Sequence, residues 1–82
     1  MGWYMNYEIE FEEEIEWDDE AVKKCLKNFD VEHLHLKDYI TTRVILRVYS
    51  HYSVEQILAV LKGLYDTPMR YRPYNSVEWT TV

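Results

Sequence analysis

The sequence has few of the residues that brace or punctuate a small fold: one cysteine, two glycines and two prolines among 82 residues. A single cysteine excludes an intramolecular disulfide and a zinc site built on several cysteines. No stretch approaches the about 20 apolar residues that cross a bilayer, and the start lacks the basic and apolar segments of a signal peptide. We therefore expect a cytoplasmic protein that depends on its hydrophobic core alone.

Catalytic signatures are also missing from the sequence. Neither glycine belongs to a glycine-rich phosphate loop, and no nucleophile stands at a spacing that indicates a partner base. Cys25 falls on an apolar helical stripe, which favours a buried structural thiol. We expect a protein that is not an enzyme and needs no cofactor.

What is present is typical of one globular domain spanning residues 1–82. The chain is 48% hydrophobic, 16% aromatic and 29% charged, which excludes a disordered or low-complexity segment. At about 100–200 residues per domain, the length leaves no room for a second folded unit.

Negative charge is concentrated at one end of the chain. The formal net charge is −6, from 9 basic and 15 acidic residues. Residues 1–22 contain no Lys or Arg, whereas residues 23–82 carry a net charge of +3. Such asymmetry indicates an electrostatic partner. The acidic residues of the first segment are Glu8, Glu10, Glu12, Glu13, Glu14, Glu16, Asp18, Asp19 and Glu20.

Residues 3–17 alternate with a period of two, the pattern of a strand with one buried face. Apolar side chains occupy most odd positions, and Glu8, Glu10 and Glu12 occupy even ones. We call these three residues the glutamate row and expect them on the solvated face, with Tyr4 beside them. Because fifteen residues is long for one strand, it should end or bulge near residues 12–14.

Two segments have helical periodicity. Residues 18–29 place Val22, Cys25, Leu26 and Phe29 on one face, with Asp18 or Asp19 as the N-cap. Ser53 and Gln56 form a capping-box pattern ahead of a second apolar stripe, and Gly63 is expected to end that helix.

The remaining segments are predicted to be extended. Residues 31–50 read as two strands joined by a turn near residues 37–40, and residues 76–82 read as the last strand. Between the second helix and this strand, residues 69–74 are interpreted as a surface connection.

The predicted order is β-α-β-β-α-β, in the α+β class, with two helices on one face of a four-stranded antiparallel sheet. This order resembles the ferredoxin-like, or split βαβ, arrangement. The resemblance implies that the first and third strands are central and that the second and fourth lie at the edges. It implies no functional residue, because this topology carries many functions.

The acidic segment carries the functional hypothesis. One interpretation is structural: the acids form a solvated sheet face and cap a helix. The functional interpretation is a docking surface for a basic groove, in which the carboxylates imitate nucleic-acid phosphates. In this character, carried by Glu8–Glu16 and Asp18–Glu20, the chain resembles small acidic phage proteins such as anti-CRISPR proteins, and the immunity proteins that neutralise nucleases. The implied partner is a basic nucleic-acid-binding effector or nuclease. Calcium binding is disfavoured because no Asp-x-Asp loop with glycine is present.

The sequence leaves other interpretations open. A regulatory or oligomerisation module could pair through the edge strand at residues 76–82, so the chain could be a monomer or a homodimer. Direct nucleic-acid binding through Arg43, Arg47, Arg70 and Arg72 is disfavoured by the glutamate row on the same sheet. His33 and His35 could hold a metal, but surface histidines are the better interpretation.

Overall fold

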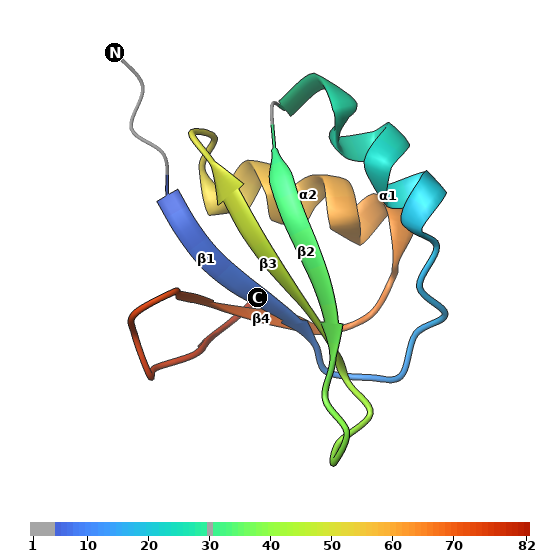
Figure 1. Cartoon of the computed structure of the whole chain (residues 1–82), viewed down its shortest axis with the longest axis vertical. Helices are drawn as coiled ribbons and strands as arrows, with labels where there is room; N and C mark the ends of the chain where they lie inside the picture. Colours follow the sequence, from blue (N-terminus) through green and yellow to red (C-terminus); the bar gives the residue numbers. More distant parts are fainter. Residues whose placement is uncertain (1–4, 30) are drawn as a thin grey trace.

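In a computed structural model, which describes residues 5–29 and 31–82, the chain is an α+β domain with an antiparallel sheet of five strands (Figure 1). The sheet order is β2-β3-β1-β4-β5. The elements are β1 (Met5–Phe11), α1 (Asp19–Leu26), a 3₁₀ turn (Lys27–Phe29), β2 (Glu32–Lys37), β3 (Val44–Ser50), α2 (Val54–Leu64), β4 (Met69–Pro73) and β5 (Thr80–Thr81).

Both helices pack on the same face of the sheet, and the core lies between these two layers. The odd-numbered residues of β1 point toward the helices, and Ile9 and Phe11 have no exposed surface. They share the core with Val22 of α1 and with Ile57 and Leu61 of α2. Burying one such side chain contributes about 1.5–3 kcal/mol. The period-two prediction for this strand is therefore confirmed over Met5–Phe11, and the strand ends just before the expected break.

Helix α1 begins as the sequence predicts. The side chain of Asp18 accepts a hydrogen bond from the backbone N–H of Ala21 at 3.1 Å, which satisfies one of the free donors of the first turn. The backbone N–H of Asp18 donates to the hydroxyl of Tyr65 at 2.7 Å. This bond fixes the start of α1 beside the end of α2. Val22 and Leu26 are buried, and the 3₁₀ turn carries the segment to Phe29.

Helix α2 has the predicted capping box of Ser53 and Gln56. The prediction that Gly63 ends this helix is wrong, because the helix runs through Gly63 to Leu64. Gly63 has no positive φ, so its special freedom is not used. The helix ends where Tyr65 turns to extended backbone, with its N–H still donating to the carbonyl of Leu61 at 2.7 Å.

The β2–β3 hairpin turns at Asp38–Arg43, slightly later than the predicted residues 37–40. One carboxylate oxygen of Asp38 accepts hydrogen bonds from the N–H groups of Ile40 and Thr41. Thr42 takes the left-handed conformation that glycine would normally supply, with φ at 59°. An aspartate-centred turn thus replaces the missing glycine.

The interpretation of residues 69–74 as a surface connection is wrong. Met69–Pro73 form β4, which pairs with β1 on one side and β5 on the other. The predicted last strand at 76–82 is reduced to Thr80–Thr81, so the sheet has five strands rather than four. The first and third strands are inner strands and β2 lies at an edge, as expected. The predicted last strand also lies at an edge, as β5, but β4 separates it from β1.

Candidate functional site

The glutamate row does not form a free anionic face. Glu8 and Glu10 lie on the side of β1 that faces away from the helices, yet each side chain is only 6% exposed. The sheet register explains this burial. Glu8 stands opposite Arg47 of β3 and Arg72 of β4, and Glu10 stands opposite Arg70 of β4. Glu8 thus faces an arginine on each neighbouring strand, and Glu10 faces one on β4.

Glu8 is held by both flanking strands. Arg47 Nε donates to Glu8 Oε2 at 2.9 Å, and Arg72 Nε donates to Glu8 Oε1 at 3.0 Å. Burial raises the pKa of Glu8, but the hydrogen bonds and positive charges of these arginines outweigh burial and leave the pKa below its ordinary value of 4.5. Glu8 is therefore ionised and internally neutralised.

Glu10, two residues further along β1, is also bound by two arginines. Arg70 Nε donates to Glu10 Oε1 at 2.7 Å, and Arg43 Nη1 approaches the same oxygen at 3.3 Å. Charge-assisted bonds of this length are among the stronger polar contacts in proteins.

Aromatic rings lie against three of these arginines. The guanidinium of Arg47 lies 5.3 Å from the ring centre of Tyr74. Arg70 and Arg72 lie 4.5 Å and 4.4 Å from the ring centre of Trp79. These are cation–π distances. Tyr74 and Trp79, which follow β4, therefore pack against three of the four arginines of the network.

The exposed carboxylates lie in the β1–α1 connection. Glu12 is half-buried, and its N–H donates to the carbonyl of Pro68 at 2.9 Å. Glu13, Glu14 and Glu16 are exposed and line a depression of about 430 Å³ together with Asp66. We call these four residues the acidic depression. No ion pair joins any of the four within residues 5–29 and 31–82.

The acids at the start of α1 have local roles. Asp18 is the helix cap, and Asp19 pairs with Lys23 at 3.0 Å. The Lys23 hydrogen bond lowers the pKa of the exposed Asp19 carboxyl. Glu20 lines a shallow surface region with Lys23 and Lys24. These acids are therefore partly compensated by the lysines of the same helix.

The predicted site residues thus divide into separate groups. The structure brings Glu13, Glu14 and Glu16 together, places Glu8 and Glu10 in an internal network, and leaves Asp18, Asp19 and Glu20 on the helix. Tyr4 lies outside the described residues. Asp66 was missed by sequence reasoning, since it follows α2 and only the chain's return to β4 brings it beside the β1–α1 connection.

His33 and His35 lie on the side of β2 that faces the helices. The rings of His35 and Trp17 stack with centroids 4.8 Å apart. Burial lowers the pKa of His33, and its Nδ1 is buried without a hydrogen-bond partner. Within the described part of the chain, no group of three or more His, Cys, Asp or Glu residues is placed to hold a metal ion.

Among the described helices, none is long and apolar enough to cross a membrane. Comparison of the chain with protein-family models, with curated proteins and with solved structures found no match.

Proposed function

We propose that this chain is a non-enzymatic acidic protein that binds a basic protein surface through the acidic depression. The observation that carries the proposal is the contrast between its carboxylates. Glu8 and Glu10 are already neutralised by arginines, whereas Glu13, Glu14, Glu16 and Asp66 are exposed around one shallow depression. Like charges gathered without a compensating cation do nothing for folding, so an external cation accounts for them best.

The partner's chemistry follows from the depression. Carboxylates spaced along a connection attract lysine and arginine, as the phosphates of nucleic acid do. Tyr65, which is half-buried and also lines the depression, offers an aromatic surface for close contact. A nuclease or another nucleic-acid-binding effector in the cytoplasm is the class of partner that fits. An anti-CRISPR-like or nuclease-immunity role, encoded by a phage, is the biological form that we propose.

We also infer that the domain is a ferredoxin-like variant. The order β2-β3-β1-β4 with both helices on one side supports this assignment, and β5 is an addition after the common core.

The test begins with capture of a partner from host lysate and its identification. Its affinity is then measured for the wild type and for two variants of equal charge change. Glu13→Gln/Glu16→Gln removes two acids from the depression, and Glu32→Gln/Glu78→Gln removes two exposed acids elsewhere. Two exposed ion pairs correspond to about a tenfold loss.

We expect that loss, with a weaker dependence on salt, only for the Glu13/Glu16 variant. Nucleic acid should compete with the protein for the partner. Equal affinities for the two variants, or a partner without a basic surface, would rule the proposal out.

A second candidate function is self-association through β2. This strand of six residues is an edge of the sheet, and Leu34 is 54% exposed on it. An exposed edge with an apolar side chain invites pairing with another strand. Sedimentation equilibrium tests this candidate. A dimer that Leu34→Lys dissociates would support it, and a monomer at high concentration would exclude it.

A further inference from the structure

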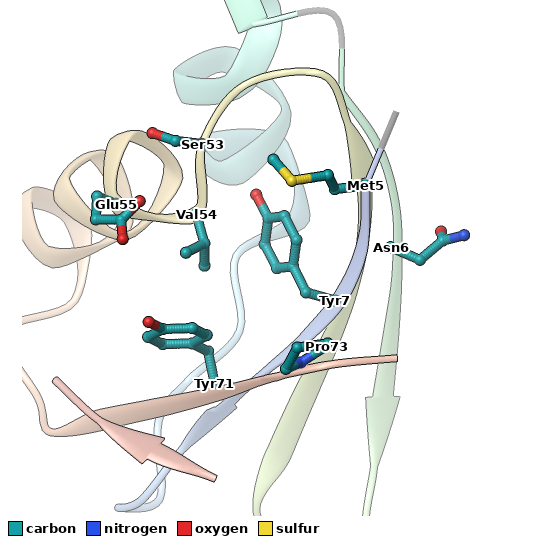
Figure 2. Close-up of a pocket in the computed structure, with 8 residues that line it drawn as sticks. All are labelled: Met5, Asn6, Tyr7, Ser53, Val54, Glu55, Tyr71 and Pro73. Atoms are coloured by element: carbon teal, nitrogen blue, oxygen red, sulfur yellow. The ribbon is translucent and has the colours of Figure 1, made fainter. Parts of the chain in front are cut away.

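A pocket of about 520 Å³ lies between β1, β4 and the start of α2, away from the acidic depression (Figure 2). Its walls are mainly apolar: Met5, Tyr7, Val54, Tyr71 and Pro73. Glu55, in the first turn of α2, stands at its side. Volumes of about 300–1,000 Å³ with apolar walls and a few polar groups are typical of small-molecule sites.

The hydroxyl of Tyr7 is the unusual polar group of this pocket. Tyr7 is 4% exposed, and its hydroxyl is buried without any hydrogen-bond partner. Figure 2 shows the ring directed from β1 toward the start of α2, with the oxygen beside Met5. An unpaired buried hydroxyl lowers the free energy of unfolding by about 1–3 kcal/mol. Its presence in the core therefore indicates a function other than stability.

The neighbouring polar groups do not serve as that partner. The hydroxyl of Ser53 is engaged with Gln56 at 3.1 Å in the capping box. The side chain of Asn6 points away from the pocket in Figure 2. Burial, and then the negative charge of Glu55, raise the pKa of Tyr7, so the phenol remains a neutral hydrogen-bond donor.

We propose that this pocket binds a small, uncharged, largely apolar molecule whose carbonyl oxygen accepts the hydrogen bond of Tyr7. The rings of Tyr7 and Tyr71 and the side chain of Val54 supply the apolar contact. Glu55 gives selectivity, because its carboxylate repels anions of the same shape. Met5 lies beside the hydroxyl and is unbranched and flexible, so it can move to admit the ligand.

The proposal is tested by titrating the full chain with three probes of similar size and monitoring the backbone amide resonances by NMR. Acetophenone has a phenyl ring and a carbonyl, ethylbenzene lacks the acceptor, and benzoate carries a negative charge. Acetophenone should shift the amides of residues around the pocket and bind about fivefold more tightly than ethylbenzene, the value of one hydrogen bond. Benzoate should bind more weakly than acetophenone.

Two variants separate the roles of the polar groups. Tyr7→Phe removes only the unpaired hydroxyl and is expected to fold. It should reduce the affinity for acetophenone to that for ethylbenzene, and it should leave the affinity for ethylbenzene unchanged. Glu55→Gln should strengthen the binding of benzoate without strengthening that of the two uncharged probes. No amide shifts near the pocket with acetophenone, or an affinity for acetophenone that Tyr7→Phe does not alter, would overturn the proposal. Neither result depends on the acidic depression.

Discussion

Arg47 Nε donates a hydrogen bond to Glu8 Oε2 at 2.9 Å and so joins β3 to β1 on the face opposite the helices. The two residues are 39 positions apart in the sequence. Glu8 belongs to the acidic first segment, and Arg47 belongs to the remainder, which has a net positive charge. The pair shows that the glutamate row is not a free anionic face. The carboxylates of Glu8 and Glu10 join β1 to its neighbouring strands, and the exposed carboxylates lie in the connection between β1 and α1.

Replacing Glu8 tests this structural role. Glu8→Gln keeps the shape but removes the charge that Arg47 and Arg72 bind, so we expect a loss of about 1.5–3 kcal/mol in the free energy of unfolding. Urea denaturation measures it, and the exposed Glu78→Gln, with an expected change within about 0.5 kcal/mol, is the control. A double-mutant cycle with Arg47→Met should show coupling; additive losses would contradict a direct interaction.

Much of the fold follows from local patterns in the sequence. The alternation around Ile9 and Phe11, the cap at Asp18 and the capping box at Ser53 each depend on neighbouring residues, and each is confirmed. The β4 strand was missed because Arg70 and Arg72 look like surface residues. Their alternation with Tyr71 becomes a strand pattern only when Glu8 and Glu10 stand opposite.

The candidate site was harder to predict for the same reason. Sequence spacing places Glu8, Glu10 and Glu12 on one strand face, but the charges across the sheet depend on which strands become neighbours. The arrival of Asp66 beside Glu13 and Glu16 likewise depends on the path of the chain after α2. Long-range pairing, rather than local propensity, decides which carboxylates remain exposed.

Tyr7→Phe should stabilise the protein in the absence of ligand. The substitution removes a buried hydroxyl that has no partner and changes little else, so the free energy of unfolding should rise by about 1 kcal/mol. Tyr71→Phe, at a half-buried position in the same pocket, is the control and should have a smaller effect. Thermal and urea denaturation give the values; a clear loss of stability in Tyr7→Phe would mean that the hydroxyl has a partner.

His33 should make stability depend on pH in mild acid. Burial first, and then Lys23 and His35, lower the pKa of His33 in the folded state below its usual 6.5, whereas Asp19 opposes the shift. As the pH falls below about 6.5, the unfolded chain binds a proton at His33 and the folded chain does not. Stability is therefore lost until the pH reaches the lower folded value, and His33→Gln should flatten this part of the profile. An unchanged profile in urea denaturation would contradict the assignment.

Trp79 should stabilise the sheet through Arg70 and Arg72. Trp79→Leu keeps an apolar side chain but removes the ring face, and we expect a loss of about 0.5–2 kcal/mol in the free energy of unfolding. Trp79→Phe retains a smaller ring and should lose less. Equal losses in urea denaturation would show that only apolar area matters at this position.

The most direct test of the account is an NMR titration of the glutamate side-chain carboxyl carbons between acid and neutral pH. The central claim is that Glu8 is neutralised internally by Arg47 and Arg72, so the midpoint of its titration should lie below its ordinary pKa of 4.5. A Glu8 resonance that titrates at or above that value would contradict the ion-pair network, and would return the strand face to the surface available for a basic partner.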